Sequence, residues 1–167
     1  MRMRNMLLAI TGAALMLGGC ATVDDAPPQA APAYYVMRHL QKAEGGSDPA
    51  LSTEGTANAQ RLAAWFEGKA KPQAIYVSTT RRARETAMPL AAKLGLTPKE
   101  YNPADTAALV ARVRADAGSV LVVGHSNTVP DIVAGLGGTR PAPLGEMDFG
   151  TVWMVARDGG ATEPLTL

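Results

Sequence analysis

Short apolar segments that alternate with helix-like segments constrain the fold of this chain more than any other feature. The clearest is Val120-Leu121-Val122-Val123, which is apolar throughout, as a central strand of a parallel sheet is. Segments 34–37 and 74–77 have the same character. Because helical patterns separate these runs, we predict an α/β fold. It is a three-layer sandwich with a mostly parallel central sheet and helices on both faces.

Capping and stop residues give approximate bounds to the predicted helices. One helix begins at Ser52 or Thr53 and stops at Gly68, and another spans 82–94 and is closed by Gly95. A third begins after Asp105 and reaches Ala117, and a short fourth covers 130–136. Further strands are expected near 97–101, at 151–155 as an edge strand, and within 161–167.

The first twenty residues have the layout of an export signal. Arg2 and Arg4 precede an apolar run that ends in Leu17-Gly18-Gly19-Cys20. This ending resembles the bacterial lipobox, which implies lipidation, including palmitate, on Cys20. The alternative is a plain secretory signal with an incidental cysteine. Cys20 is the single cysteine of the chain, which favours lipidation.

This prediction divides the chain into three parts. Residues 1–19 are a signal peptide, 20–32 are an Ala/Pro-rich tether from lipidated Cys20, and 33–167 are the folded domain. Ala21 rather than an aspartate follows the cysteine, and in lipoproteins of Gram-negative bacteria this implies sorting to the outer membrane. We therefore expect a lipid anchor at the periplasmic face of that membrane.

The charge balance excludes one large class of partners. The 167 residues hold 16 lysines and arginines against 15 acidic residues, a formal net charge of +1. No basic stripe is present, so we predict no nucleic-acid partner. The oligomeric state is not predicted.

Polar residues follow three of the apolar runs. Arg38-His39, Ser78 to Arg82, and His125 come directly after predicted strands, and the chain has two histidines in all. In such sheets, ligands bind beyond the carboxyl ends of the strands. Two imidazoles and several guanidinium groups without a carboxylate cluster favour an anion site over a metal site. Phosphoryl transfer fits this set, because a neutral imidazole attacks phosphorus while arginines hold its oxygens.

Four motifs in order then make the sequence recognisable. They are Val36-Met37-Arg38-His39, Leu51-Ser52-Thr53-Glu54-Gly55, Ser78-Thr79-Thr80-Arg81-Arg82-Ala83-Arg84-Glu85-Thr86-Ala87 and Gly124-His125-Ser126-Asn127. Together they resemble the histidine phosphatase superfamily, whose members are phosphoglycerate-mutase-like. The resemblance implies a phosphatase that works through phosphohistidine and needs no metal or other cofactor.

The resemblance also assigns roles. It implies that His39 is the nucleophile, that Arg38 and Arg82 bind the phosphoryl oxygens, and that His125 completes the pocket. Arg81 and Arg84 are expected to be solvated helix residues. Two alternatives stay open for Ser126 and Asn127: they donate to a phosphate oxygen, or they only cap the following helix.

Two departures from the family pattern limit these expectations. Leu40 stands where the family has Gly or Ala, and a bulkier side chain there is expected to narrow the pocket mouth. No residue clearly supplies the general acid that a poor leaving group needs. Glu100 and Asp131 are the nearest candidates, and each has an equal reading as a surface residue. Without an acid, phosphohistidine, acyl phosphates and aryl phosphates are the favoured substrates.

The functional hypothesis is a phosphatase at the cell envelope that acts on a small phosphorylated compound. Its alternative is a non-catalytic envelope lipoprotein that binds phosphoryl ligands with the same pocket. A third reading is a structural lipoprotein with a vestigial pocket.

Overall fold

The computed structural model describes residues 31–158 and 162–167. The predicted signal peptide, Cys20 and the tether as far as residue 30 lie outside the described residues. Six strands and four helices follow one another along the described chain: β1 Ala33–Arg38, α1 Thr53–Trp65, β2 Pro72–Ser78, α2 Arg81–Leu94, β3 Lys99–Tyr101, α3 Thr106–Ala115, β4 Ser119–Gly124, α4 Val129–Gly135, β5 Thr151–Ala156 and β6 Thr162–Thr166.

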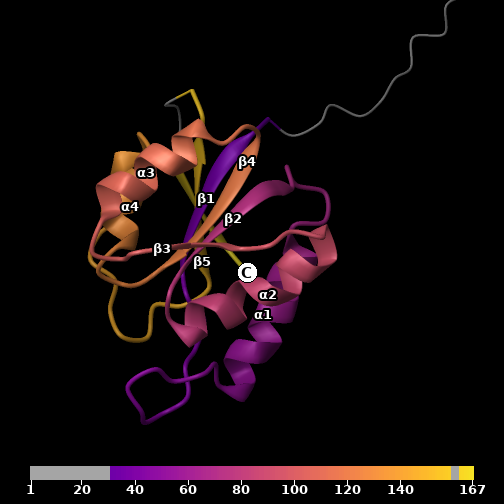
Figure 1. Cartoon of the computed structure of the whole chain (residues 1–167), viewed down its shortest axis with the longest axis vertical. Helices are drawn as coiled ribbons and strands as arrows, with labels where there is room; N and C mark the ends of the chain where they lie inside the picture. The colour runs from indigo at the N-terminus through magenta and orange to yellow at the C-terminus, as the bar shows by residue number, and fades with distance from the viewer. Residues whose placement is uncertain (1–30, 159–161) are drawn as a thin grey trace, which may run out of the picture.

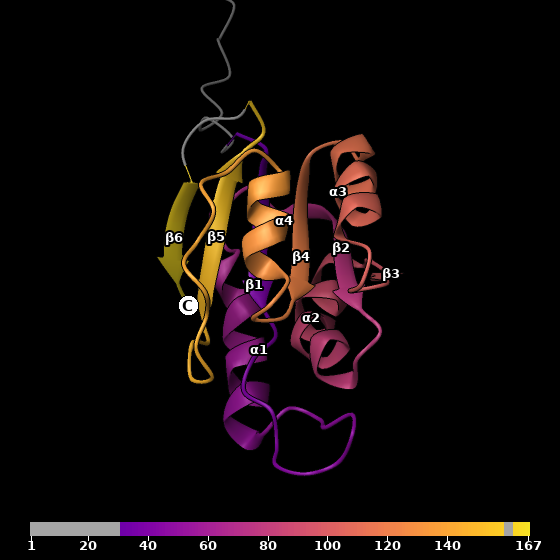
Figure 2. The same ribbon diagram turned by 90° about the vertical axis from the view of Figure 1, so that its left-hand side faces the viewer.

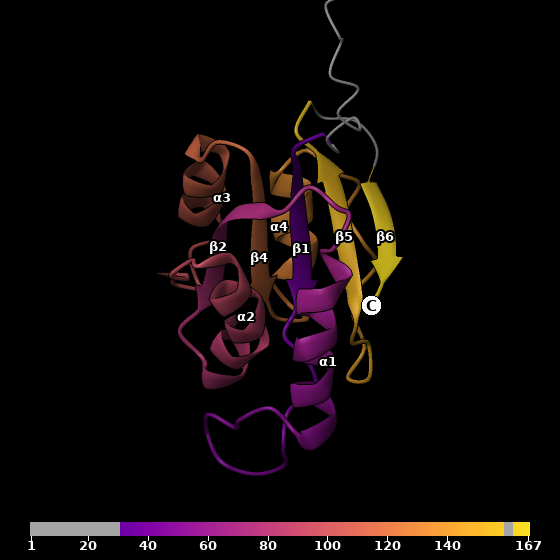
Figure 3. The same ribbon diagram turned by 90° about the vertical axis from the view of Figure 1, so that its right-hand side faces the viewer.

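All six strands form one sheet in the order β3-β2-β4-β1-β5-β6. Strands β3, β2, β4 and β1 are parallel to one another. Strand β5 pairs antiparallel with β1 on one side and with β6 on the other. Figures 2 and 3 show this order across the sheet. The predicted α/β fold with a mostly parallel sheet is confirmed. The prediction that 151–155 is an edge strand is wrong, because β5 lies between β1 and β6.

Helices cover both faces of the sheet (Figure 1). Because strand side chains alternate between the faces, β1 contributes to two cores. Tyr35 and Met37 pack in the cluster that includes residues of α1 and α2. Tyr34 and Val36 pack in the opposite cluster, with residues of α3 and α4. These two apolar layers hold the sheet rigid from both sides.

The helix ends follow the capping signals of the sequence. The Ser52 side chain accepts from the backbone N–H of Gly55 and caps α1, which ends at Trp65, before Gly68. Gly95 takes φ 66° after α2, a left-handed conformation that glycine adopts at little cost. Among the described residues, no helix is both long and apolar enough to cross a membrane.

The carboxyl ends of β1, β2 and β4 lie at one edge of the sheet. Arg38 pairs with Gly124, and Val77 pairs with Val123, so the residues after these strands start from adjacent positions. Two long connections, one from β1 to α1 and one from α4 to β5, lie at this end of the molecule (Figure 2). The candidate site is therefore built where parallel strands end and loops begin.

Candidate active site

The two histidines meet at this edge of the sheet. The backbone N–H of His39 donates to the Gly124 carbonyl at 2.9 Å and extends the β1–β4 ladder by one residue. His125 follows Gly124 directly, and the two imidazole centroids are 5.3 Å apart. Parallel pairing of adjacent strands thus brings together two residues that are far apart in the sequence.

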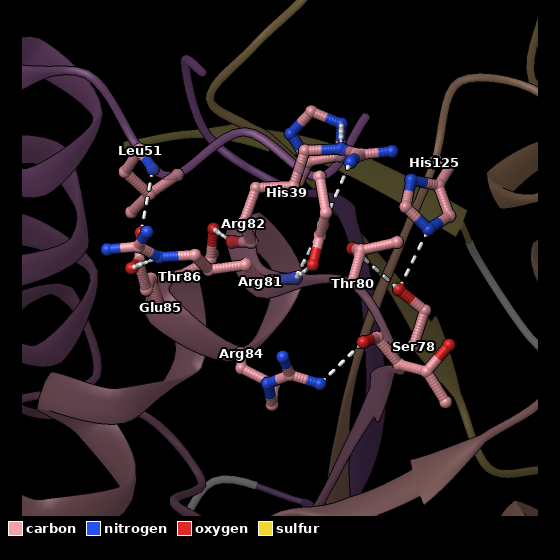
Figure 4. Close-up of polar contacts among 12 residues, drawn as sticks. His39, Leu51, Ser78, Thr80, Arg81, Arg82, Arg84, Glu85, Thr86 and His125 are labelled. Carbon is pink, nitrogen blue, oxygen red and sulfur yellow. Dashed lines mark hydrogen bonds and ion pairs between the residues drawn. The ribbon is translucent and has the colours of Figure 1, made fainter. Parts of the chain in front are cut away.

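The hydrogen bonds of His39 fix its tautomer. Nδ1 lies 2.8 Å from the Leu40 carbonyl oxygen, which only accepts, so Nδ1 carries the proton. In a neutral imidazole, Nε2 then holds a lone pair. The Arg82 Nε–H donates to this Nε2 at 3.1 Å, as expected for an unprotonated nitrogen (Figure 4). In this tautomer, Nε2 of His39 is the ring nitrogen that carries a lone pair.

Both histidines are neutral near pH 7. Burial lowers the pKa of His39 from 6.5 to about 4; the hydrogen bond to Leu40 opposes this, and the charges of Arg82, His125 and Arg38 reinforce it. Burial, Arg82 and Arg38 lower the pKa of His125 to about 4 as well. Desolvation and neighbouring cations both disfavour the imidazolium form. An incoming phosphate dianion reverses this electrostatic balance.

Ser78 at the end of β2 holds His125. The Ser78 hydroxyl lies 2.8 Å from His125 Nε2 and 3.1 Å from the Thr80 hydroxyl (Figure 4). The Thr128 hydroxyl accepts from the backbone N–H of His125 at 3.0 Å. These contacts hold His125 from the end of β2 and from the residue that caps α4.

Arg82 is the arginine of α2 that faces His39. Its neighbour Arg81 pairs with Glu85 at 2.6 Å, and Arg84 pairs with Glu100 at 3.2 Å. The sequence prediction that chooses Arg82 among the three therefore agrees with these positions. Arg82 also lies 3.6 Å from the carboxylate of Asp48, which accepts from the backbone N–H of Arg81 at the start of α2.

Arg38 is held under the connection from α4 to β5. Its Nη1 donates to the carbonyls of Gly145 at 2.7 Å, Glu146 at 3.1 Å and Asp148 at 3.3 Å. The Phe149 ring centroid is 4.2 Å from the guanidinium carbon. Arg38 is 4% exposed, and its buried Nε–H has no partner among the described residues. An unpaired donor of this kind is costly unless a ligand oxygen satisfies it.

Leu40 does not narrow the pocket mouth, contrary to expectation. Its side chain is fully buried in the core cluster beneath α1 and α2. Its backbone N–H donates to the Thr86 hydroxyl at 3.0 Å, and that hydroxyl donates to the Arg82 carbonyl at 2.8 Å. Thr86 thus links the segment after His39 to the turn of α2 that carries Arg82, which explains the Arg-Ala-x-x-Thr spacing.

The other predicted site residues make no side-chain hydrogen bond or ion pair with the imidazoles of His39 and His125 in the described structure. Glu100 pairs with Arg84, and Asp131 pairs with Arg140. The residue that caps α4 is Thr128, without a side-chain cap bond, so the capping alternative for Ser126 and Asn127 is not what is observed. The Ser126 side chain is half-buried and that of Asn127 is exposed beside His125.

Two carboxylates near the arginines were not foreseen from the sequence. Asp48 lies against Arg82, and Glu146 lies 3.9 Å from Arg38. Both belong to irregular connections without hydrophobic periodicity, so no sequence signal places them at the site. The residues 31–158 and 162–167 contain no group of three His, Cys, Asp or Glu side chains arranged for a metal ion.

Residues 34–104 match the model of the histidine phosphatase superfamily (branch 1). Over these residues the chain is similar to the histidine phosphatase superfamily. The match covers Arg38, His39 and Arg82, and it supports a histidine-type phosphatase. His125 lies beyond the matched residues, and the fold brings it to the same site.

Solved structures share the fold of this chain. A structure of the protein histidine phosphatase SixA in complex with tungstate matches with a TM-score of 0.60 and 23% identity, over 80% of this chain and 94% of that chain. A mycobacterial glucosyl-3-phosphoglycerate phosphatase matches with a TM-score of 0.60 and 18% identity, over 81% of this chain and 97% of that chain. Comparison with curated protein sequences gives no match.

Proposed function

We propose that the protein removes the phosphoryl group from a small phosphorylated compound through a covalent phosphohistidine on His39, without a metal ion, at the cell envelope. The observation that carries the proposal is the tautomer of His39. Its Nδ1–H donates to the Leu40 carbonyl, and its Nε2 lone pair faces the pocket beside Arg82.

In the first step, His39 Nε2 forms a bond to phosphorus. The bond from phosphorus to the leaving oxygen breaks, and that oxygen keeps the electron pair and takes a proton from solvent water. Arg82 and Arg38 stabilise the charge that spreads over the three other oxygens. His125 lies 5.3 Å from His39 between ring centroids, close enough to donate to the same oxygens once it is protonated.

In the second step, water attacks phosphorus and the N–P bond breaks. His39 Nε2 regains its lone pair, and inorganic phosphate leaves with the oxygen and both protons of the attacking water. The two guanidinium groups of Arg38 and Arg82 supply positive charge without a metal ion.

The leaving oxygen needs a proton whenever it belongs to an alkyl alcohol. Among the described residues, Glu100 and Asp131 pair with arginines away from the two histidines, and Asp48 and Glu146 pair with Arg82 and Arg38 themselves. We therefore expect aryl and acyl phosphates to react faster than alkyl monoesters. The tungstate bound by SixA is a tetrahedral oxyanion, which supports a pocket of this kind in the shared fold.

The envelope location rests on the sequence of residues 1–20. A signal run ending in Cys20 supports lipidation, and an acyl chain contributes ~0.8 kcal/mol for each buried CH₂. Several acyl chains on one residue would hold the domain at the membrane surface.

Hydrolysis measurements separate this proposal from phosphoryl binding without turnover. The wild-type protein should release phosphate from an aryl phosphate in the presence of EDTA. His39→Ala should lose at least about 10³-fold in kcat, because no nucleophile remains. Phosphate binding without any turnover would favour the non-catalytic alternative. Equal turnover by His39→Ala would discard the covalent mechanism, and loss of activity in EDTA would discard its metal independence.

A further inference from the structure

The connection from α4 to β5 covers more than Arg38. Its residues 141–149 are here called the 141–149 loop. Most of them line a hollow of about 400 Å³, together with Thr151 and Trp153 of β5. Most of the lining side chains are apolar: Pro141, Pro143, Leu144, Met147, Phe149 and Trp153. A cavity of this size, with both apolar side chains and polar groups exposed in its walls, is large enough for a small organic molecule.

This hollow adjoins the predicted phosphoryl site through Phe149 and Asp148. Phe149 lines the hollow, and its ring is also 4.2 Å from the Arg38 guanidinium carbon and 6.0 Å from the His39 ring, between centroids. Asp148 lines the hollow as well, and its carbonyl accepts from Arg38. A molecule with its phosphoryl group at His39 would therefore have its organic part beside Phe149.

The rim of the hollow has an unusual exposed side chain. Met147 is 83% exposed, whereas the other large hydrophobic side chain exposed in the described part of the chain is Met88, on α2, at 53%. Trp153 in the wall is only partly buried against the core. Met147 and Trp153 thus leave apolar surface exposed in the lining of the hollow.

We propose that the hollow under the 141–149 loop receives an apolar, ring-sized organic group of the phosphorylated substrate. This inference rests on the proposed phosphatase function and adds a substrate class to it. The phosphoryl group would occupy the arginines and histidines, and the ring would lie between Phe149, Trp153 and Met147. Small substrates such as acetyl phosphate would fill the phosphoryl site alone.

The test compares 1-naphthyl phosphate with acetyl phosphate as substrates of the full chain. Met147→Ala and Trp153→Leu should each lower the ratio of kcat/KM for 1-naphthyl phosphate to that for acetyl phosphate by about fivefold to tenfold. Met88→Ala is the matched control, since it removes the same exposed side chain from another surface, and it should leave the ratio unchanged. A ratio unchanged in both test variants overturns the proposal.

A binding measurement separates this inference from the proposed function. Wild-type protein is titrated with 1-naphthylmethylphosphonate and with methylphosphonate, which cannot be hydrolysed. The naphthyl compound should bind about tenfold more tightly, and Met147→Ala should remove most of that difference. This result in a protein without any turnover would support the hollow and overturn the phosphatase function. Equal affinity for the two phosphonates overturns the hollow, whatever the turnover.

Discussion

The immediate neighbours of His39, rather than an acidic partner, set the tautomer and the neutral state that its proposed role as nucleophile needs. A backbone carbonyl holds the proton on Nδ1, and burial together with nearby arginines keeps the ring neutral. An aspartate in place of the carbonyl would raise the pKa and favour the imidazolium form. The free site therefore combines a lone pair on His39 Nε2 with the guanidinium charges of Arg82 and Arg38 beside it.

This balance predicts how phosphate changes the titration of His125. In the free protein, the pKa of His125 is about 4, lowered by burial, Arg82 and Arg38. A bound phosphate dianion stabilises the imidazolium form, so the pKa should rise by at least one unit. Nuclear magnetic resonance titration of the two imidazoles, with and without phosphate, measures it. A free-protein pKa near 6.5, or one that phosphate does not move, would contradict the described electrostatics.

Ser78 should act as a positioning residue for His125. Ser78→Ala removes the 2.8 Å contact with Nε2, and we expect kcat/KM for an aryl phosphate to fall about tenfold, with ~1 kcal/mol lost from the free energy of unfolding. Ser119→Ala is the matched control. This buried serine accepts from the backbone N–H of Ala33, where β1 begins, so only stability should fall. Equal losses of activity in both variants would refute the role of Ser78.

At the scale of elements, residues of the family motifs pack helices against the sheet and its loops as well as forming the site. Gly55 lies in the first turn of α1, against the Gln41 carbonyl, and a Cβ built at Gly55 would lie 2.1 Å from that oxygen. Ser52 caps the same turn, and its backbone N–H donates to Gln41 at 2.9 Å. The Leu-Ser-x-x-Gly spacing therefore anchors α1 to the segment that follows His39.

Gly55→Ala should consequently destabilise the domain. The added methyl group must displace the backbone after His39, and overpacking of this kind costs ~1–3 kcal/mol. Urea unfolding measures this change in free energy. Gln60→Ala, an exposed change on the same helix, should alter stability by no more than ~0.5 kcal/mol. A Gly55→Ala protein as stable as wild type would show that the close approach is not required.

The periodic patterns of the sequence were enough to predict the strands and helices. They could not predict contacts that are made by irregular segments. Apolar runs and capping residues were enough to place the strands and helices, and parallel pairing then implied that His39 and His125 meet. The edge position predicted for 151–155 was wrong, because the residues of one strand do not show which strands pair with it. The burial of Leu40 and the contacts of Asp48 and Glu146 depend on loop conformations that have no periodic signal.

At the scale of the whole molecule, the site and the start of the domain lie at opposite ends of β1. The strand begins at Ala33 and ends at Arg38, directly before His39. Six residues of strand span ~20 Å. If Cys20 carries the lipid, attachment at the amino end of β1 would leave the pocket open to soluble substrates.

This arrangement predicts that anchoring and catalysis are separable. Cys20→Ser should move the protein from the membrane fraction to the soluble fraction of a bacterial host and abolish labelling by a palmitate analogue. Its kcat/KM for acetyl phosphate should stay within twofold of the anchored protein. Cys20→Ser protein that remains lipid-labelled would contradict the assignment of Cys20. A large loss of kcat/KM would contradict the separation of anchor and site.

Trapping the phosphorylated enzyme tests the central claim most directly. Wild-type protein is mixed with a ³²P-labelled aryl phosphate and quenched in alkali, which preserves phosphohistidine, or in acid, which destroys it. We predict a label that survives the alkaline quench, disappears in acid, maps to the peptide containing His39 and is absent from His39→Ala. Turnover without any alkali-stable label, or a label on another residue, would contradict the account.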